Sequence, residues 1–253
     1  MPIASVKNLS KVYGMPNSDV RVQALRGISI DFEEAETVAI IGQSGSGKST
    51  LMNLLGCLDR PTTGEYWLGE LNVARLSDDE LSDARGRRIG FVFQSFNLIN
   101  QLTIEENLEV PLFYQGWPAS KRKPKAQEIA AMVGLADRIH HRPNQLSGGQ
   151  QQRAAIARAL INDPLIILAD EPTGNLDTAT TEEILAIFEE LHSRGRTILM
   201  VTHEMEVAER CSRIITLRDG EIISDERTKD RGSTSADQAP VGVPAASPPS
   251  QAT

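Results

Sequence analysis

The sequence predicts an α/β fold with a mainly parallel sheet, and two observations support that prediction. Short apolar runs recur along the chain at residues 37–41, 89–93, 165–169 and 197–201. Continuous runs of this length are typical of strands buried on both faces of a parallel sheet. Helical patterns lie between them, and this alternation indicates an α/β architecture. Two other regions break the alternation, which predicts an N-terminal antiparallel β subdomain and an inserted helical subdomain.

Two of the intervening segments have clear helical periodicity. Each places four apolar residues on one face of a helix. These are Leu51, Leu54, Leu55 and Leu58 in the first segment, and Ile184, Leu185, Phe188 and Leu191 in the second. Gly195 follows the second set and is expected to cap the C-terminus of that helix.

The regions that break the alternation define the expected domain organisation. Residues 3–36 carry antiparallel β patterns, and residues from about 95 to 160 are mainly helical in pattern. We therefore expect one domain over residues 3–224, with the helical subdomain inserted in it. From residue 225 onward apolar periodicity is lost and Ser, Ala, Pro and Gln dominate. Such a composition predicts a disordered tail over residues 225–253.

Shorter signals locate individual elements. The clearest strands of the N-terminal region are expected at residues 12–13 and 28–32. Asp219-Gly220, between two β-rich segments, predicts a tight hairpin. Capping boxes, which start helices, are predicted by the pairs Ser77 with Glu80 and Thr103 with Glu106.

Charge and composition narrow the possible functions. The chain has 26 Lys and Arg residues against 34 Asp and Glu residues, which gives a formal net charge of −8. Such a surface repels nucleic acid, so no nucleic-acid partner is expected. Cys57 and Cys211 lie far apart without metal-ligand spacing, which suits a reducing cytoplasm. No apolar run approaches the roughly 18 residues that span a bilayer, and the N-terminus lacks a signal-peptide core, so we expect a soluble protein.

A glycine-rich loop follows the apolar run at 37–41 and precedes the first helical pattern. It matches the pattern G-x-x-x-x-G-K-[ST] and consists of Gly42, Gln43, Ser44, Gly45, Ser46, Gly47, Lys48, Ser49 and Thr50. The glycines let successive backbone N–H groups point at phosphate oxygens, and the following helix presents its positive N-terminal end. Lys48 is expected to reach the β- and γ-phosphates, and the Ser49 hydroxyl to bind Mg²⁺. The loop therefore predicts nucleotide binding by a P-loop NTPase core.

Two carboxylates, Asp170 and Glu171, follow the apolar run at 165–169. Ligands of α/β proteins bind at the carboxyl ends of the strands. We therefore expect Asp170 to face Mg²⁺ through water, and Glu171 to orient or deprotonate an attacking water. An isolated Asp-Glu pair often does no more than open a loop, but the P-loop upstream favours the catalytic interpretation.

A second glycine signal, LSGGQQQR, lies at residues 146–153 before a helical segment. A serine and two glycines at a helix N-terminus can bind an anion. Ser147 would serve equally well as an ordinary helix cap. The chemistry of these residues leaves both interpretations open.

Taken together, these motifs resemble those of the ABC ATPases. Leu146-Ser147-Gly148-Gly149-Gln150 resembles the signature motif of that family and lies between a P-loop and a carboxylate-tipped strand. Tyr13 resembles the aromatic residue that stacks on adenine, and Gln94 the glutamine that senses Mg²⁺. The segment 174–177, which ends at Asp177, resembles the loop that crosses the dimer interface, and His203 resembles the histidine that contacts the γ-phosphate. The resemblance covers residues from about 3 to 224.

Each of these landmarks has a plainer interpretation when taken alone. A lone tyrosine packs more often than it stacks, a glutamine at a strand end is commonly a polar edge, and His203 could be a structural histidine. Their order around the stronger motifs favours the family roles. One stretch departs from the family, whose members usually carry glycine in the turn before the P-loop strand. This chain has Glu34-Ala35-Glu36 there, so an altered hairpin is expected.

The resemblance implies a mechanism in which two copies pair head to tail, with each ATP between one P-loop and the other copy's signature motif. It implies that Ser147 and Gly149 of one copy bind the γ-phosphate held by the P-loop of the other. It also implies catalytic roles for Lys48, Glu171 and His203. Mg²⁺ would be bound by Ser49, Gln94 and Asp170, and the nucleotide by the P-loop residues, Tyr13, Gln94, Ser147, Gly148, Gly149, Gln150 and Asp177.

Partners follow from the same resemblance. It implies a homodimer that drives a separate transmembrane permease from the cytoplasmic face of the cell membrane. Residues 54–64 and 89–112 resemble the branch that holds macrolide-export and lipoprotein-release ATPases. An importer ATPase for amino acids or metals and a cell-division ATPase remain alternatives. A translation factor or DNA-repair ATPase fits poorly, because the chain has one set of motifs and no sustained heptads. The cargo depends on the permease and is not encoded here.

Overall fold

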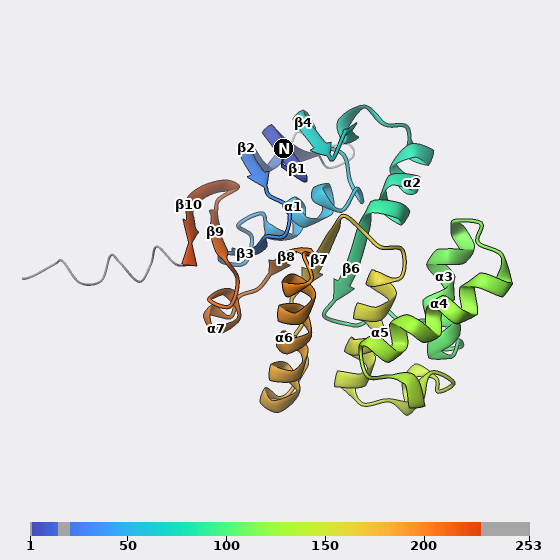
Figure 1. Cartoon of the computed structure of the whole chain (residues 1–253). Helices are drawn as coiled ribbons and strands as arrows, with labels where there is room; N and C mark the ends of the chain where they lie inside the picture. Colours follow the sequence, from blue (N-terminus) through green and yellow to red (C-terminus); the bar gives the residue numbers. More distant parts are fainter. Residues whose placement is uncertain (1, 15–20, 229–253) are drawn as a thin grey trace, which may run out of the picture.

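Two β-sheets form the framework of the protein, whose computed structural model describes residues 2–14 and 21–228 (Figure 1). The first sheet is antiparallel and has the strand order β2 (Arg21–Phe32), β1 (Ala4–Gly14), β4 (Thr63–Leu68) and β5 (Leu71–Asn72). The second has the strand order β10 (Glu221–Arg227), β9 (Arg213–Arg218), β3 (Thr37–Ile41), β8 (Thr197–Val201), β7 (Ile166–Asp170) and β6 (Ile89–Phe93). Its strands run parallel except for β10, which pairs antiparallel with β9.

Helices connect these strands. The α-helices of the described residues are α1 (Lys48–Leu55), α2 (Asp78–Arg88), α3 (Ile104–Tyr114), α4 (Ala119–Met132), α5 (Gly148–Leu160), α6 (Thr178–Ser193) and α7 (Met205–Ala208). Short 3₁₀ helices lie at η1 (Val73–Arg75), η2 (Ala136–Arg138) and η3 (Pro143–Gln145). The helices α3 and α4 lie at one side of the molecule, beyond α5 (Figure 1). None of the helices in the described part of the chain is long and apolar enough to cross a membrane.

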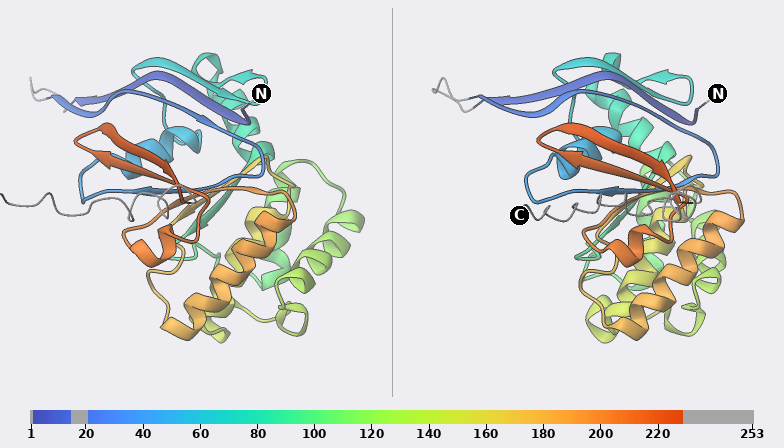
Figure 2. Two further views of the ribbon diagram at one scale, coloured as in Figure 1. Left: turned by 60° about the vertical axis from the view of Figure 1, so that its left-hand side comes forward. Right: turned by 90° about the vertical axis from the view of Figure 1, so that its left-hand side faces the viewer.

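The two sheets and the helices stack in layers. Figure 2 shows the antiparallel sheet above the six-stranded sheet, with α1 between them and α6 on the opposite face. One apolar core fills the space between the sheets around α1, and a second packs α3 to α6 against the other face of the six-stranded sheet. This arrangement leaves the N-terminus of α1 at the carboxyl end of β3.

The central strands contact both cores at once. In β7, Ile166 and Leu168 belong to the core between the sheets, whereas Ile167 and Ala169 belong to the core under the helices. All four are essentially inaccessible to solvent. Because successive side chains of a strand point to opposite faces, only a continuous apolar run can fill both cores. The sequence-based interpretation of these runs as doubly buried strands is therefore confirmed.

The predicted strand positions agree closely with the structure. The runs at 37–41, 89–93 and 197–201 form β3, β6 and β8 with the same bounds. The fourth prediction was displaced by one residue, since β7 begins at Ile166 and includes Asp170. Leu165 is 36% exposed, and its N–H donates to the carbonyl of Arg88, so it belongs to the connection before the strand.

The predicted caps and hairpin are also present. Both predicted capping boxes form, with Ser77 and Thr103 each accepting from the backbone N–H three residues on. Asp219 and Gly220 join β9 to β10 with φ values of 51° and 81°, as a two-residue hairpin turn with positive φ at both positions requires. In the N-terminal region, β1 and β2 are longer than the strands expected at 12–13 and 28–32, because they pair with each other along their length.

The turn before β3 shows how this chain manages without glycine. Ala35 adopts a left-handed backbone with φ of 55°. Its N–H donates to Thr197 Oγ1 at 2.9 Å, and its carbonyl lies 2.9 Å from His192 Nε2. These two bonds hold the turn against β8 and α6. The altered hairpin expected from the absence of glycine is therefore a turn with a strained backbone at Ala35 that its neighbours hold in place.

The expected tail begins inside a strand. Residues 225–227 belong to β10, where the Asp225 carboxylate accepts two hydrogen bonds of 2.6 Å from the Arg213 guanidinium. The strand therefore continues three residues past the predicted boundary, because pairing with β9 outweighs the loss of apolar periodicity. The rest of the predicted disordered tail, from residue 229 on, lies outside the described residues.

Candidate active site

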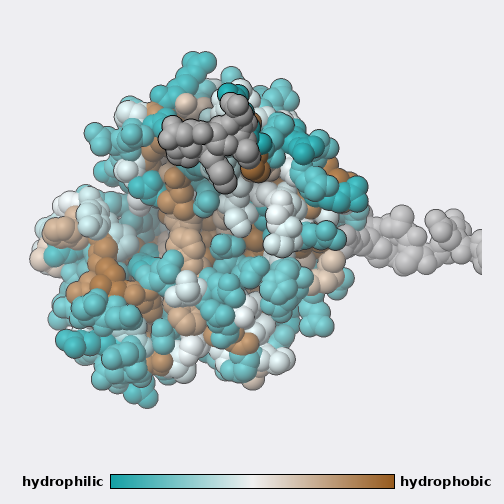
Figure 3. Space-filling view, turned by 180° about the vertical axis from the view of Figure 1, so that it is seen from behind, coloured by the Kyte–Doolittle hydropathy of each residue, from teal (hydrophilic) through white to brown (hydrophobic). Residues whose placement is uncertain are grey.

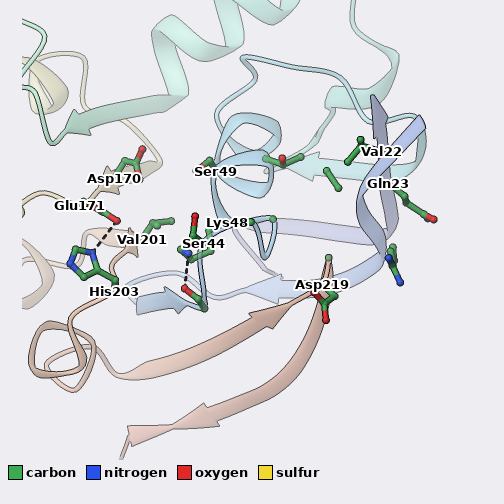
Figure 4. A pocket seen from close by; sticks show the side chains of 17 residues that line it. Val22, Gln23, Ser44, Lys48, Ser49, Asp170, Glu171, Val201, His203 and Asp219 are labelled. Atoms are coloured by element: carbon green, nitrogen blue, oxygen red, sulfur yellow. Dashed lines mark hydrogen bonds and ion pairs between the residues drawn. The ribbon is translucent and has the colours of Figure 1, made fainter. Parts of the chain in front are cut away.

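A cleft of ≈ 610 Å³ opens at the carboxyl ends of β3, β7 and β8. Figure 4 shows Asp170, Glu171 and His203 on one side, Val22 and Gln23 on the other, and Lys48 and Ser49 between them. The complete lining is Val22, Gln23, Ala24, Arg26, Gly42, Ser44, Gly45, Gly47, Lys48, Ser49, Thr50, Asp170, Glu171, Val201, His203, Asp219 and Gly220. The fold thus brings the P-loop and the acidic pair together, although they lie far apart in the sequence.

The conformation of the P-loop requires its glycines. Gly42, Gly45 and Gly47 have φ values of 153°, 79° and 103°, which L-residues rarely adopt. A Cβ at Gly42 would also collide with the Leu217 carbonyl oxygen, and one at Gly47 would lie 2.8 Å from that of Ala24. The backbone of the loop therefore packs directly against the backbone of β9 and β2, with no room for a side chain between them.

Two polar groups of the P-loop are arranged around its turn. Lys48 Nζ donates to the carbonyl oxygens of Gly42 at 2.7 Å and Gln43 at 3.0 Å, so its ammonium group lies across the loop. The Ser46 hydroxyl is buried without a hydrogen-bond partner among the described residues. A lysine ammonium and successive backbone N–H groups at the start of a helix form an electropositive site suited to phosphate.

The acidic side of the cleft holds a carboxylate next to an imidazole. Glu171 has a positive φ of 45°, and its backbone N–H donates to the Val201 carbonyl at 2.9 Å. This backbone bond fixes the residue after β7 against the end of β8. The Glu171 Oε1 lies 3.1 Å from His203 Nδ1 (Figure 4). A carboxylate held in this way at the mouth of a phosphate site can accept a proton from water.

Asp170 lies deeper, at the end of β7. Burial raises the pKa of its carboxyl group, and the negative charge of Glu171 raises it further, against an opposing effect of Lys48. Burial and a like charge both disfavour the ionised form. A divalent cation next to Asp170 would remove that penalty, so the donor set of Asp170 and Ser49 fits a hard oxygen-binding ion.

Several predicted site residues lie outside the cleft lining, among them Gln43 and Ser46 of the P-loop, as well as Gln94 and Tyr13. Gln94 follows β6, and its Nε2 donates to Asn175 Oδ1 at 3.3 Å, while Asn175 Nδ2 donates to the backbone carbonyl of Gln94 at 3.1 Å. Tyr13 is 40% exposed and lies directly opposite Val22, a lining residue, in the β1–β2 pair. Tyr13 is thus at the rim of the cleft, whereas Gln94 is turned toward the 174–177 loop.

The second glycine motif starts α5 and is separate from the cleft. Ser147 caps this helix and forms a capping box with Gln150. Gly148 and Gly149 face Leu176 and Thr180, and Asp177 caps α6 through the Thr180 N–H. None of these residues lines the cleft in the structure as described. Within one chain, the exposed Ser147 caps α5 and does not face the P-loop cleft. An anion bound at Ser147 would therefore have to be held by a different molecule.

Some lining residues carried no signal in the sequence. Val22, Gln23, Ala24 and Arg26 reach the cleft because β2 passes beside the P-loop, and the sequence shows only a strand there. Asp219 and Gly220 were predicted as a turn, but the position of that turn beside α1 depends on tertiary packing.

Comparisons with known proteins agree with this arrangement. The family model described as ABC transporter matches residues 25–174. An uncharacterized ABC transporter ATP-binding protein of Thermotoga maritima is 56% identical over 217 residues, which are 86% of this chain and 92% of the relative. The macrolide export ATP-binding/permease protein MacB of Hyphomonas neptunium is 50% identical over 237 residues. That alignment covers 94% of this chain but only 36% of the relative, so the chain spans about a third of its length.

A solved structure gives the same fold. The cassette MJ0796, in a dimeric post-hydrolysis state bound to ADP and Pi, matches with a TM-score of 0.81 and 45% identity. The match covers 89% of this chain and 98% of that cassette. A further relative, the pyoverdine export ATP-binding/permease protein PvdT of Pseudomonas fluorescens, is 52% identical over 229 residues, which are 90% of this chain and 35% of the relative.

Proposed function

The chain belongs to the ABC transporter ATP-binding family, and we propose that it works as a head-to-tail dimer that drives a membrane permease of the exporter type. One observation carries the proposal. The cleft gathers the P-loop, Asp170, Glu171 and His203, but the signature residues Ser147 to Gln150 lie outside it. A second copy would supply that missing wall. The 45% identical cassette MJ0796 forms dimers, which supports this arrangement.

The roles of the cleft residues follow from their positions. The Lys48 ammonium and the backbone N–H groups of the P-loop would bind the β- and γ-phosphates of ATP. Ser49 and Asp170 would hold Mg²⁺, which neutralises phosphate charge when bound. The Gln94 side chain would join them after its Nε2 releases Asn175 Oδ1, while its backbone carbonyl can keep the hydrogen bond from Asn175 Nδ2.

Glu171 would act as the general base. Its carboxylate can accept the proton of a water that attacks the γ-phosphate, and the backbone bond to Val201 holds it in place. His203, 3.1 Å from that carboxylate, would orient it and contact the γ-phosphate. The signature residues Ser147, Gly148, Gly149 and Gln150, together with Asp177 across the interface, would close the site from the second copy.

The partner would be a membrane permease. The relatives MacB and PvdT carry ATP-binding and permease parts in one chain, whereas the Thermotoga relative of cassette length supports a permease on a separate chain. We place the ATPase at the cytoplasmic face of the membrane, where ATP is present. Its permease would belong to the macrolide-export or lipoprotein-release type.

A hydrophobic surface on the helical region supports such docking. The side chains of Phe113 and Tyr114, at the end of α3, are 61% and 82% exposed. In Figure 3 hydrophobic side chains gather on the side of the molecule that carries the helical region. Exposed aromatic residues are typical of protein interfaces, and these two lie on the helical region that would transmit dimer closure.

The test uses a glutamate that should be needed for hydrolysis but not for binding. We expect Glu171→Gln to bind ATP and elute as a dimer in gel filtration with ATP, while hydrolysis is lost. Glu190→Gln is the matched control, because Glu190 lies on α6, pairs with Arg194 at the end of that helix and does not line the cleft. Wild-type turnover by Glu171→Gln would refute the assignment of the general base.

The same trapped variant identifies the permease. Purified from membranes in detergent and ATP, it should carry an exporter-type permease with it. A permease of the importer type would overturn the exporter proposal and leave the ATPase assignment unchanged.

A further inference from the structure

Tyr13 is held by a small cluster of charged and polar groups at the rim of the cleft. Asp59, in the loop after α1, accepts a hydrogen bond from the Tyr13 hydroxyl through Oδ2 at 2.8 Å. Its Oδ1 accepts from Lys11 Nζ at 2.6 Å and from the backbone N–H of Arg60 at 2.7 Å. We call Lys11, Tyr13 and Asp59 the Tyr13 cluster.

Lys11 closes the cluster from a second direction. Its Nζ also donates to the Arg60 carbonyl at 2.7 Å and lies 4.9 Å from the centroid of the Tyr13 ring. The ammonium therefore satisfies two oxygens and contacts the ring as a cation–π partner. The side chain of Lys11 is 12% exposed and that of Asp59 is 29% exposed, so both charges are partly withdrawn from water.

The charge states of the cluster agree with this geometry. Burial alone would raise the pKa of Asp59, but the hydrogen bonds from Lys11, Tyr13 and the Arg60 N–H outweigh it and leave that pKa lowered. Burial, together with the hydrogen bond to Asp59, raises the pKa of the Tyr13 phenol against an opposing effect of the Thr50 side chain. At neutral pH the cluster therefore holds an ionised carboxylate and a protonated phenol.

The loop that carries Asp59 is fastened to both neighbouring elements. The N–H groups of Leu58 and Asp59 donate to the Asn53 carbonyl of α1, at 2.9 and 3.3 Å. The N–H of Thr62, the residue before β4, donates to the Ser10 carbonyl of β1 at 2.8 Å. Asp59 thus connects β1 to α1, the helix whose first turn carries Lys48 and Ser49.

This connection has a consequence for the cleft. Tyr13 lies opposite Val22 in the β1–β2 pair, and opposed residues of an antiparallel pair project from the same face of the sheet. Val22 lines the cleft at the end away from Asp170. The ring therefore stands at the end of the cleft opposite the catalytic carboxylates, and its hydroxyl and one face are already engaged by the cluster.

We propose that Lys11 and Asp59 are positioning residues for nucleotide-base recognition: they fix the Tyr13 ring at a set distance from the P-loop, so that a purine can stack on its free face. This inference rests on the proposed function, in which the cleft binds ATP. The cluster thereby favours ATP over ligands that have the phosphates without the base. Lys11 and Asp59 themselves touch neither the phosphates nor the reacting water.

The test compares ATP with inorganic tripolyphosphate, which has the phosphates and no base. Dissociation constants are measured by calorimetry in Mg²⁺ for the full chain and for Asp59→Asn, Lys11→Met and Tyr13→Ala. Loss of a stacking ring weakens binding about 5- to 150-fold, so Tyr13→Ala sets the scale for ATP. We expect Asp59→Asn and Lys11→Met to weaken ATP binding about tenfold, with tripolyphosphate binding unchanged.

Two further variants separate positioning from general damage. Asp83→Asn is the matched control, because Asp83 also pairs with a cation at 2.6 Å but lies on α2, outside the cleft lining. It should change neither affinity. Tyr13→Phe keeps the ring and removes only the hydroxyl, which is bonded to Asp59. This variant should lose part of the ATP affinity and still be folded at the temperature of the assay, as a thermal unfolding curve would show. In steady-state hydrolysis, the cluster variants should raise KM for ATP more than they lower kcat.

Each contrary outcome has a distinct meaning. Equal losses for ATP and tripolyphosphate in Asp59→Asn would show that the cluster supports the P-loop as a whole and would overturn the inference. A loss in Tyr13→Ala with none in Asp59→Asn, Lys11→Met and Tyr13→Phe would show that the ring needs no positioning. Absence of ATP binding by the unaltered chain would instead refute the proposed function.

Discussion

Gly149 lies at a tightly packed position at the start of α5, where an added methyl group should lower the stability of the fold. A Cβ at this position would lie closer than 3.0 Å to Thr180 Cγ2, whereas the next atoms, Thr180 Cβ and Oγ1, would be 3.7 and 3.8 Å away. The Thr180 side chain cannot turn aside freely, because its Oγ1 donates to Asp177 Oδ2 at 2.8 Å. Gly149→Ala therefore forces α5 and α6 apart.

The magnitude comes from two opposing effects. Overpacking of this kind costs about 1–3 kcal/mol. Replacing a helical glycine by alanine returns roughly 0.5–1 kcal/mol. We therefore expect Gly149→Ala to lower the free energy of unfolding by up to about 2.5 kcal/mol. Gly148→Ala is the matched control, because the nearest atom to its added Cβ is Leu176 Cδ2 at 3.4 Å, an ordinary contact.

A double-mutant cycle isolates the clash. Thr180→Ser removes Cγ2 and keeps the hydroxyl that bonds to Asp177. In that background the added Cβ at Gly149 meets only atoms beyond 3.4 Å, so Gly149→Ala should become neutral or stabilising. Urea unfolding of the four chains gives the coupling free energy, expected at about 1–3 kcal/mol. Equal destabilisation by Gly149→Ala with and without Thr180→Ser would show that the Thr180 methyl group does not cause the loss of stability.

Further predictions concern other parts of the chain. Ala35→Gly should raise the free energy of unfolding by up to about 1 kcal/mol. The left-handed backbone costs an alanine roughly 1–2 kcal/mol, and the greater chain entropy of unfolded glycine offsets part of the gain. Thermal unfolding measures this change, and a variant less stable than the unaltered chain would contradict the prediction. Burial raises the pKa of the Cys57 thiol from 9.0 to about 11 and that of Cys211 to about 12. Both thiols should therefore react slowly with a thiol reagent at pH 8 until urea unfolds the chain, and rapid labelling of the folded chain would contradict their burial. Because folding raises these pKa values, the stability the two thiols contribute is complete below pH 9 and declines as the pH rises toward 11 for Cys57 and toward 12 for Cys211.

Elements whose signals are local could be predicted from the sequence. The strands at 37–41 and 197–201 are buried on both faces. A strand buried on both faces needs apolar residues at successive positions, so a continuous apolar run predicts it directly. Capping at Ser77 and Thr103 depends on a residue only three positions away. For the same reason the P-loop was recognisable, since its glycines and Lys48 act within one turn.

Relations between distant segments could not be predicted. No pattern in the sequence places Asp59 beside Tyr13, since that contact depends on how the loop after α1 packs against β1. The collision expected at Gly149 depends on Thr180 of another helix. The family resemblance supplied roles for Tyr13 and Gln94 but not their conformations, and the structure finds Gln94 bonded to Asn175. In each case the missing information is tertiary packing.

If each ATP site is shared between two copies of the chain, mixing two inactive variants should restore activity. Lys48→Ala removes the P-loop ammonium, and Ser147→Arg blocks the signature motif, so each variant alone should lack ATP hydrolysis. In a mixed dimer one site combines both defects and the other is intact. Since half of the dimers are mixed, an equimolar mixture should recover about a quarter of the unaltered activity. No recovery on mixing, or full activity of Ser147→Arg alone, would contradict a shared site.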